Sequence, residues 1–522
     1  MSSIAWPTSW TAERRLPPAW ALAAVLATAY LAVVPGGGDL ASQSYRAHLG
    51  PVLWDNGWYG GHPMPGYSLL FPLLGGIFGA RLTGALAAVA AAAIFERLVV
   101  DRWGERARAG ALWFALGTTA NLISGRMTFA LGLALALGAV FAVGRGRRGT
   151  AAALAVLTSI TSPVAAAFLG GAAVAWWLTE RRAAAVGLGA AALLPVAALA
   201  AAFPEAGRFP FVASSFWPAL AALVGVLLAL PREERALRAA FGLTAMAAIA
   251  SFLVDNPLGG NVIRLGTMLG GPLLACALWR RRTWLLAAMA VPLLAWQWAA
   301  PVTDLARASD DPSLHRGYFT GLLRFLDRSR GEPFRVEIPF TTEHWEARWV
   351  AAAHPLARGW LRQLDTLRNP LFYTGRPLTA ARYRRWLRDN AVRFVAVPDA
   401  ALDASARAEA RLVLSGVPSL REVWRDAHWR VYEVAGARPL ASGAARAVAL
   451  GAEDVTLRAD RAGNVDLRVR FSPYWRLEGG RGCVAPAPGG WTQVRIGEGG
   501  TVRLAPSFAP GRIGAKGPRC SS

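Results

Sequence analysis

The chain has 522 residues, of which 54% are apolar and only 17% are charged, and its mean hydropathy is positive. This composition excludes an ordinary soluble enzyme and indicates a polytopic membrane protein. The formal net charge of +23 would suit a nucleic-acid-binding protein, but the arginines gather in short segments between apolar stretches, as in the cytoplasmic loops of membrane proteins.

The apolar segments predict about eleven transmembrane helices, because a crossing needs roughly 20 apolar residues and fewer where a helix is short. The first segment is predicted to be a retained helix and not a cleaved signal peptide. Residues 149–179 form one apolar run that is too long for a straight crossing, so a hairpin or helices broken at Pro163 are predicted there. The segments lie at about 18–35, 80–100, 109–124, 127–144, 150–161, 163–179, 183–203, 214–230, 239–254, 262–279 and 283–300.

The arginine clusters predict a cytoplasmic N-terminus and an extracytoplasmic C-terminal region, because arginine-rich loops stay inside. The clusters are Arg14–Arg15, Arg145 with Arg147–Arg148, Arg181–Arg182, Arg232 with Arg235, and Arg280–Arg282. The opposite loops hold isolated arginines instead, which are Arg46, Arg126, Arg208 and Arg264.

The longest predicted loop between spans is 36–79, on the extracytoplasmic side. It opens with GGGD, which places Asp39 just beyond the first helix, and it ends in SLLFPLLGGIFG, which would suit a helix on the membrane surface. The intervening WDNGWYGGHPMPGY (54–67) has no helical or strand period. It supplies a second acid and candidate groove residues, which are Asp55, Trp54, Trp58, Tyr59 and His62. The alternative interpretation is an interfacial belt of aromatic residues with glycines for turns.

Two of the isolated arginines are candidates for binding a phosphate group, because guanidinium groups pair well with oxyanions. Arg126 lies in the tight turn NLISGRMTF, and Arg264 lies in the Gly-rich loop DNPLGGNVIRLG together with Asp255 and Asn256. The alternatives are snorkelling of each arginine to the lipid headgroups and ordinary turn chemistry for Asp255 and Asn256.

After residue 300 the composition changes to a mixture of polar and apolar residues without a membrane-length segment. Residues 301–436 are predicted to form an α/β domain, with strands at 334–340, 392–398 and 429–434 and an amphipathic helix at 379–390. Within it, the segment 340–365 combines Glu343, His344 and Trp345 with further Trp and Arg residues, which favours a carbohydrate-contacting surface or a helix that docks this domain on the membrane part.

Residues 437–522 alternate between apolar and polar positions with Gly-rich turns, and this pattern predicts a small β-sandwich. It could be a carbohydrate-binding module or a lid. Cys483 and Cys520 both fall in this region, and they can form a disulfide if the region is extracytoplasmic. Cys276 is expected to be a buried small residue.

The arrangement resembles the GT-C superfamily of membrane glycosyltransferases. The shared features are an inside N-terminus, about eleven spans, a long first outside loop, an acid just after the first helix (Asp39 in GGGDLASQSY) and an extracytoplasmic C-terminal region. WYGGHPMPGYSLLFPLL also resembles a passage of an uncharacterised bacterial branch. The resemblance implies an inverting transferase of the bacterial plasma membrane that moves a sugar from a polyprenyl-phosphate donor to an extracytoplasmic glycan, lipid or protein.

Chemistry independent of the resemblance supports the same roles. A carboxylate near the membrane surface can take the proton of an acceptor hydroxyl, and such a base contributes about 10²–10⁴-fold. Asp39 is the predicted base, and Asp55 would assist it or bind a divalent cation, for which no convincing set of ligands exists.

Two other classes of function stay open. A transporter or flippase for a lipid-linked precursor would place ionisable groups near the bilayer midplane, where these spans have almost none. A non-catalytic membrane scaffold with a glycan-binding outer domain is the third hypothesis. The predicted partners are the lipid-linked donor, membrane lipids and an envelope acceptor, without nucleic acid.

Overall fold

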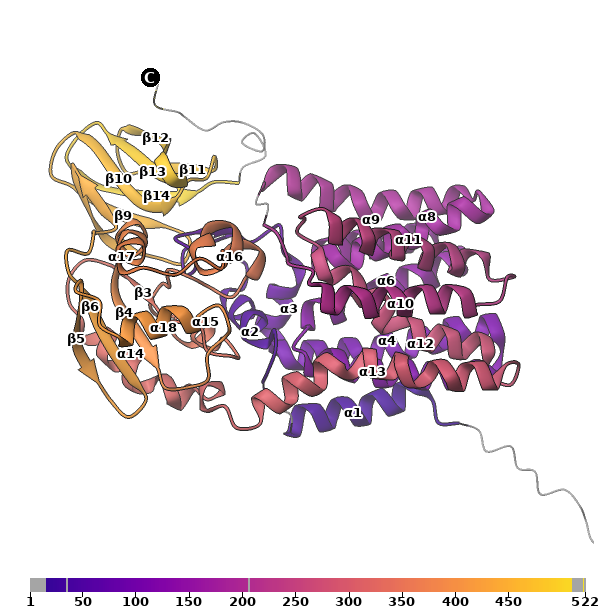
Figure 1. Cartoon of the computed structure of the whole chain (residues 1–522). Coiled ribbons are helices and arrows are strands. Elements are labelled where there is room, and N and C mark those ends of the chain that lie inside the picture. Colours follow the sequence, from indigo (N-terminus) through magenta and orange to yellow (C-terminus); the bar gives the residue numbers. More distant parts are fainter. Residues whose placement is uncertain (1–15, 34–35, 205–206, 509–519, 521–522) are drawn as a thin grey trace, which may run out of the picture.

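The computed structural model describes residues 16–33, 36–204, 207–508 and 520, and places a bundle of apolar helices beside a β-rich region (Figure 1). The predicted basic flank at Arg14–Arg15 lies outside the described residues. The bundle helices are α1 (Ala19–Val33), α4 (Ala80–Trp103), α5 (Arg108–Ile123), α6 (Met127–Gly144), α7 (Arg148–Thr161), α8 (Pro163–Glu180), α9 (Ala183–Ala202), α10 (Ala213–Ala229), α11 (Arg235–Leu253), α12 (Arg264–Leu278) and α13 (Thr283–Ala308).

The protein is a multi-pass membrane protein. The predicted number of eleven crossings is wrong, because several of the apolar helices are too short or not apolar enough to cross a membrane. Six helical segments of the described residues are long and apolar enough to cross a membrane, namely α4, α6, α9, α11, α12 with the turn that precedes it, and α13. The other five predicted spans do form helices, α1, α5, α7, α8 and α10, but they have only 14–18 residues. They fall short in length or apolarity of the roughly 20 apolar residues that a crossing needs.

Small residues allow the bundle helices to approach closely. A Cβ atom on Gly84 of α4 would lie 2.2 Å from the Met127 sulfur of α6, and one on Gly110 of α5 would lie 2.4 Å from the Pro272 carbonyl oxygen of α12. Close packing of helices through Gly and Ala is the usual arrangement in membranes, where apolar side chains gain little by leaving lipid.

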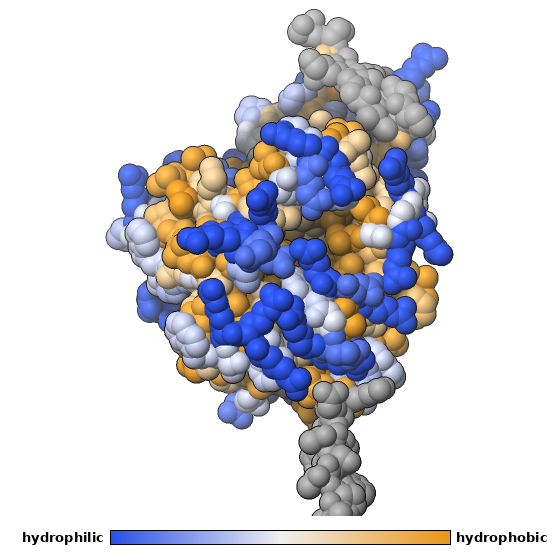
Figure 2. All heavy atoms as spheres, turned by 90° about the vertical axis from the view of Figure 1, so that its right-hand side faces the viewer, coloured by the Kyte–Doolittle hydropathy of each residue, from blue (hydrophilic) through white to orange (hydrophobic). Residues whose placement is uncertain are grey.

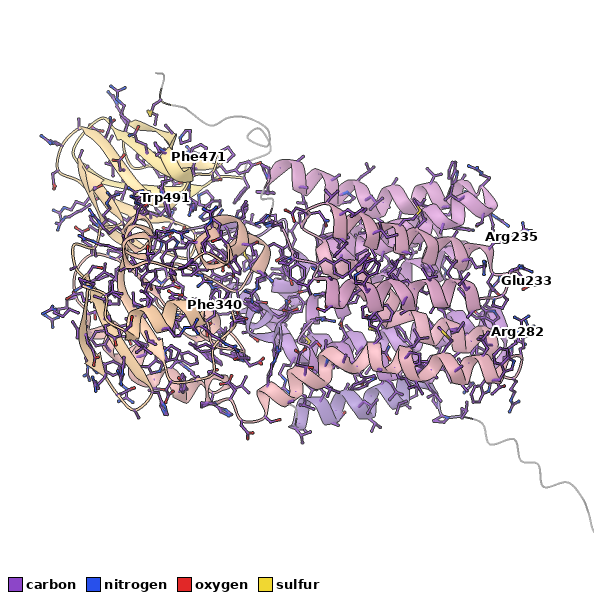
Figure 3. The ribbon with its side chains drawn as sticks, in the orientation of Figure 1. Glu233, Arg235, Arg282, Phe340, Phe471 and Trp491 are labelled. Carbon is purple, nitrogen blue, oxygen red and sulfur yellow. A yellow bond between two sulfur atoms is a disulfide. The ribbon has the colours of Figure 1, made fainter. Side chains whose placement is uncertain are left out.

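The two ends of the bundle differ in charge. Figure 2 shows hydrophilic side chains gathered on the end that faces away from the β-rich region. The turns with Glu233, Arg235 and Arg282 lie there (Figure 3). The predicted arginine-rich loops and the β-rich region therefore occupy opposite ends of the bundle.

The predicted first loop forms a layer between the bundle and the β-rich region (Figure 1). It consists of α2 (Leu40–Leu49), the short antiparallel strands β1 (Trp54–Asp55) and β2 (His62–Pro63), and α3 (Leu70–Phe78). Helix α3 coincides with the predicted surface helix and leaves Leu73, Ile77 and Phe78 exposed. Exposed apolar side chains on a short helix suit contact with lipid.

The first β-sheet has the order β3-β4-β6-β5, with β3 parallel to β4 and the other pairs antiparallel. The predicted strands 392–398 and 429–434 are confirmed as β4 (Val392–Pro398) and β6 (Trp429–Val434). The predicted strand 334–340 is shorter than expected, β3 (Arg335–Glu337), and β5 (Leu420–Arg425) completes the sheet. The predicted helix is α17 (Ala380–Asp389). The remaining helices of this part are α14 (Thr320–Arg328), α15 (Glu346–Trp349), α16 (Arg362–Arg368) and α18 (Arg407–Leu414).

The last part of the chain forms two four-stranded antiparallel sheets, β12-β13-β10-β7 and β11-β14-β9-β8, around one apolar core. The strands are β7 (Ala441–Gly443), β8 (Ala445–Leu450), β9 (Val455–Ala459), β10 (Gly463–Arg470), β11 (Trp475–Glu478), β12 (Gly482–Ala487), β13 (Trp491–Ile496) and β14 (Gly500–Pro506). A disulfide joins Cys483 to Cys520, and Cys276 is a buried free thiol.

Candidate active site

Asp39 is held by two backbone turns that touch each other. The amide of Asp39 donates a 3.1 Å hydrogen bond to the carbonyl of Ser124. Gly38 has φ +62°, and a Cβ atom on it would lie 2.7 Å from the Ser124 carbonyl oxygen. On the other side Gly125 has φ +70°, and its Cβ would lie 2.3 Å from the amide nitrogen of Leu40. Only glycine fits at both positions, because other residues would be strained and would overlap backbone atoms.

The Asp39 carboxylate faces an arginine from another helix. Asp39 occupies the N-cap position of α2 but makes no side-chain capping bond. Its Oδ2 instead lies 3.6 Å from Nη2 of Arg264, with 39% of the Asp39 side chain and 17% of the Arg264 side chain exposed. This distance makes an ion pair but is longer than a hydrogen bond. The carboxylate is therefore accessible and charge-paired.

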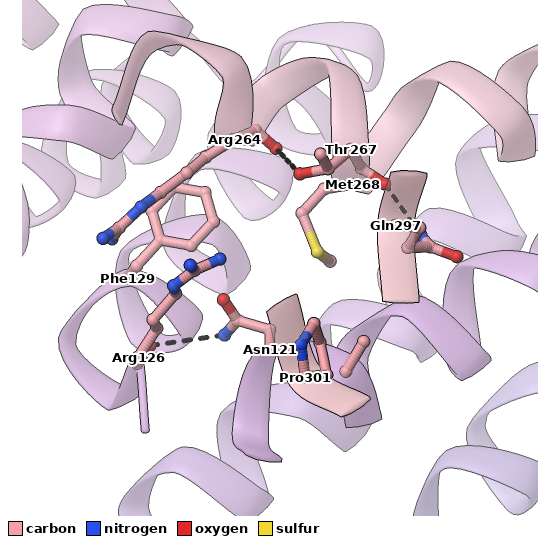
Figure 4. A pocket seen from close by; sticks show the side chains of 9 residues that line it. Asn121, Arg126, Phe129, Arg264, Thr267, Met268, Gln297 and Pro301 are labelled. Atoms are coloured by element: carbon pink, nitrogen blue, oxygen red, sulfur yellow. Dashed lines mark hydrogen bonds between the residues drawn. The ribbon is translucent and has the colours of Figure 1, made fainter. Parts of the chain in front are cut away.

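Arg264 and Arg126 line one small pocket at this end of the bundle. Its volume is only about 10 Å³, and Figure 4 shows both arginine side chains beside Phe129. The Arg264 guanidinium lies 5.7 Å from the Phe129 ring centre, which fits a cation–π contact. The other lining residues are Ala120, Asn121, Thr267, Met268, Gln297 and Pro301.

A second acid, Glu343, supports the turn that carries Asp39. Glu343 Oε2 accepts a 2.7 Å hydrogen bond from the Gly38 amide, and the Trp345 indole donates a 2.7 Å bond to the Gly36 carbonyl. Glu343 is 3% exposed, and burial raises its pKa to about 7, with the nearby Asp304 acting in the same direction. Asp304, on α13, accepts a 2.7 Å bond from the Ser124 hydroxyl and so supports the other turn.

A third arginine, Arg46, lies on α2 behind Asp39. It is 1% exposed, and its guanidinium lies 3.3 Å from the Tyr67 ring centre. Its Nε and one Nη atom have no hydrogen-bond partner, and burial lowers its pKa. Asp39 is among the charges that act on it. Arg46 and Arg126 thus add positive charge near the ion pair of Asp39 with Arg264.

Asp55 lies in the neighbouring loop and is fully buried. Its carboxylate accepts 2.8 Å bonds from the Tyr45 hydroxyl and from the Gly57 amide, and it lies 3.3 Å from His62 Nε2. These contacts give Asp55 a role in ordering loop 54–67. A catalytic or metal-binding role for Asp55 stays a prediction.

The aromatic residues of loop 54–67 face protein in this structure. Trp58 stacks on Tyr45 at 4.4 Å and donates to the Ala347 carbonyl, while the Tyr59 hydroxyl bonds to the Gly359 carbonyl. Trp54 packs against Trp475 of the sandwich. The loop therefore contacts both β-regions from the layer that lies between them and the bundle. Contact of these side chains with a substrate stays a prediction.

The remaining predicted residues have different surroundings. Asp255 makes an exposed ion pair with Arg208, at 2.9 Å. The Asn256 side chain accepts bonds from the amides of Leu258 and Gly259 and so orders the loop that leads to Arg264. His344 stacks on Trp360 at 3.4 Å and is buried. The structure thus brings together Asp39, Arg264, Arg126, Glu343 and Trp345.

The described residues contain no group of three or more His, Cys, Asp or Glu side chains arranged to hold a metal ion. The carboxylates near Asp39 do not form a ligand set, so no reaction step is assigned to a metal. No protein-family model matches the chain, and comparison with curated proteins also gives no match.

Two residues of the site are not among the sequence-predicted site residues. Arg46 is visible in the sequence as an isolated arginine seven positions after Asp39, a spacing that puts both on one face of α2. Asp304 gives no such signal, because it lies 265 residues from Asp39 at the end of α13.

Proposed function

We propose that the protein is an integral membrane glycosyltransferase of GT-C type. It transfers a sugar, with inversion, from a polyprenyl-phosphate donor to an extracytoplasmic glycan, lipid or protein acceptor. The observation that carries this proposal is the contact of the accessible Asp39 carboxylate with Arg264, at the end of the apolar bundle that adjoins the β-rich region.

Asp39 acts as the general base. The acceptor hydroxyl attacks the anomeric carbon, its proton passes to the Asp39 carboxylate, and the bond between the anomeric carbon and the donor phosphate oxygen breaks. The electron pair of that bond leaves with the lipid phosphate. Because the hydroxyl attacks the face opposite the leaving phosphate, the sugar configuration inverts. The two backbone turns around Gly38 and Gly125 fix the carboxylate, which keeps the base in position without a large ordering cost at the moment of reaction.

Arg264 and Arg126 bind the donor phosphate and stabilise the charge that it gains on leaving. Guanidinium groups that are fixed before the reaction stabilise such charge efficiently. Arg46, a residue of α2 itself, adds positive charge behind Asp39. In the absence of donor, the Asp39 carboxylate pairs with Arg264, and the phosphate replaces it as the partner of this arginine when the donor binds.

The orientation in the bacterial plasma membrane belongs to the same proposal. The arginine-rich turns at the far end of the bundle suit the cytoplasmic face, which leaves Asp39 and the β-rich region outside. The disulfide between Cys483 and Cys520 is compatible with an oxidising compartment.

The test is sugar transfer by the purified protein in nanodiscs. Radiolabelled polyprenyl-phosphate sugars and cell-envelope acceptors are supplied, and the wild type is compared with Asp39→Asn and Asp39→Ala. Both variants are expected to lose about 10²–10⁴-fold of the transfer rate, because the base is absent. Asp460→Asn, an exposed acid of the sandwich, serves as the matched control and is expected to keep the wild-type rate.

Two outcomes contradict the proposal. Transfer that persists in both Asp39 variants would remove Asp39 as the base. A folded wild-type protein that turns over no donor, but moves a lipid-linked precursor across the bilayer or only binds glycan, would favour the transporter or the scaffold.

A further inference from the structure

A large cleft separates the first β-region from the sandwich. It has a volume of about 790 Å³, and it lies between α16 and α17 on one side and β10, β12 and β13 on the other. Trp491 is in its wall (Figure 3). This volume lies in the upper part of the roughly 300–1,000 Å³ range of small-molecule pockets, so the cleft can accommodate a few linked rings.

Positive charge dominates the lining. Five arginines contribute to it, against two acids, Asp389 and Asp466. Asp389 already pairs with Arg438 at 3.4 Å, and Asp466 accepts a bond from Gln493. The lining arginines are Arg368, Arg382, Arg385, Arg468 and Arg470.

A buried arginine behind the wall adds to this excess. Arg335 is fully buried and lies 5.8 Å from the Trp491 ring centre. It donates to the backbone carbonyls of Asn390 and Arg468, its Nε has no partner, and none of the described carboxylates is in ion-pair contact with it. Burial and the neighbouring Arg468 lower its pKa to about 9. A buried cation without a counter-ion is costly, and an anion in the cleft would reduce that cost.

The cleft wall also contacts the loop next to the candidate active site. Arg470 donates from its backbone amide to the Gly60 carbonyl and from Nε to the Tyr59 carbonyl, and Arg368 donates to the Gly61 carbonyl. Tyr59, Gly60 and Gly61 form the positive-φ tip of loop 54–67. The same turn therefore borders both the cleft and the layer that carries Asp39.

We propose that this cleft binds an anionic glycan, whose carboxylate or phosphate groups pair with the cleft arginines. This inference rests on the proposed function for one point only, the identity of the glycan as the acceptor of the transferred sugar. The aromatic residues argue against a single-stranded nucleic acid as the ligand, and the glycan is bound through the cleft arginines. Trp386 and Trp491 are only 8% and 5% exposed, whereas single-stranded nucleic acids need open aromatic faces for base stacking.

The experiment measures binding directly, with no sugar donor present. The full-length protein in nanodiscs is titrated with a fluorescent oligogalacturonate, which carries carboxylates, and with a fluorescent poly(glycerol phosphate) glycan, which carries phosphates. Neutral dextran of the same length is the uncharged probe. We expect binding of at least one anionic probe that weakens as salt is added, and at least tenfold weaker binding of dextran.

Three variants locate the site. Arg382→Ala with Arg385→Ala, and Arg468→Ala separately, should each weaken binding of the anionic probe by about tenfold or more. Arg446→Ala removes an exposed arginine from β8, on the other sheet of the sandwich, and should leave the affinity unchanged. Arg382 and Arg385 are exposed, so their replacement should not disturb folding, and thermal unfolding of each variant checks this directly.

The outcomes separate this inference from the proposed function. Asp39→Asn should bind the probe as the wild type does, so a failed transferase assay leaves this result intact. Equal affinity for dextran, affinity unchanged by the cleft variants, or tighter binding of a single-stranded oligonucleotide or of polyglutamate would overturn the inference.

Discussion

The amide of Gly38 donates a 2.7 Å hydrogen bond to the carboxylate of Glu343, across 305 residues of sequence. Gly38 precedes Asp39 at the end of the bundle, whereas Glu343 belongs to the β-rich region that follows the last helix. The bond therefore ties the position of the candidate base to the packing of the outer region. Because Glu343 is buried, its protonation state affects that packing.

Glu343 makes stability depend on pH. Its pKa is raised to about 7 in the folded protein, mainly by burial, from an ordinary value of 4.5. Between pH 4.5 and 7 the folded state binds more protons than the unfolded state, so the free energy of unfolding should fall as pH rises through this window. Glu343→Gln removes the titration, so the wild-type Tm should decline relative to that of the variant between pH 5 and 7. Thermal unfolding in detergent measures this difference.

An exposed carboxylate provides the matched control. Glu498→Gln changes the same chemical group at the surface of the sandwich, and its Tm should run parallel to that of the wild type across the same pH range. If Glu343→Gln also ran parallel to the wild type, Glu343 would not be the titrating group.

Gly38 should be intolerant of a side chain. Gly38→Ala places a Cβ atom 2.7 Å from a backbone oxygen at φ +62°, and backbone atoms cannot move aside cheaply. We expect a loss of about 1–3 kcal/mol in the free energy of unfolding, together with a loss of transfer activity as Asp39 shifts. Gly187→Ala is the control, since a Cβ atom there meets no other atom within 4 Å and Ala is the better helix former. Equal effects of the two substitutions would show that the turn is not close-packed.

The arginines should differ in their effect on transfer. Arg264→Ala removes both the partner of Asp39 and a phosphate-binding group, so we expect kcat/KM for the donor to fall by about 10²–10³-fold. Arg264→Lys keeps the positive charge but lacks the planar guanidinium group that binds two phosphate oxygens at once, so its kcat/KM should lie between those of Arg264→Ala and the wild type. Arg208→Ala, an exposed arginine paired with Asp255, should have no effect on kcat/KM. Initial rates at several donor concentrations distinguish these results, and activity of Arg264→Ala equal to that of the control would exclude its role.

The strands and the amphipathic helix of the β-rich region could be predicted closely. The predicted strand 392–398 coincides with β4, and the predicted helix 379–390 differs from α17 by one residue at each end. Both have the alternation or helical spacing of apolar residues that their burial requires. The number of crossings could not be predicted, because α1, α5, α7, α8 and α10 are apolar but their helices end too early or include polar residues.

The site was predictable as a set of candidates but not as a geometry. Asp39 and Arg264 stand out as an acid after the first helix and an isolated arginine in a Gly-rich loop. Their contact joins the start of α2 to the start of α12, which are more than 200 residues apart in the sequence. The burial of Trp58 could not be predicted either. Glycines and aromatic residues suit an open groove and a buried junction equally well, and only the contacts of Trp58 with Tyr45 and Ala347 show that it is buried.

A buried charge cluster in the first β-region yields the last prediction. Arg358 lies 2.8 Å from Asp365, 3.1 Å from Glu409 and 3.6 Å from Glu337, and all four side chains are buried. One guanidinium cannot neutralise three carboxylates, and the Tyr383 hydroxyl adds only a hydrogen bond to Glu409. Burial and the neighbouring Glu409 raise the pKa of Glu337 well above its ordinary value. The folded protein therefore holds the Glu337 proton to a higher pH than the unfolded chain does.

The retained proton should make the fold sensitive to base. Above pH 4.5 the unfolded chain releases the Glu337 proton while the folded chain holds it, so the free energy of unfolding falls as pH rises toward the raised pKa. Glu337→Gln has the shape of the protonated acid and carries no titrating proton, so its Tm should rise relative to that of the wild type as pH increases above 4.5. Asp365→Asn is the contrasting variant: it removes the closest carboxylate partner of Arg358 and should lower Tm at every pH. A Glu337→Gln variant whose Tm does not rise relative to that of the wild type as pH increases above 4.5 would mean that the fold does not raise the pKa of Glu337.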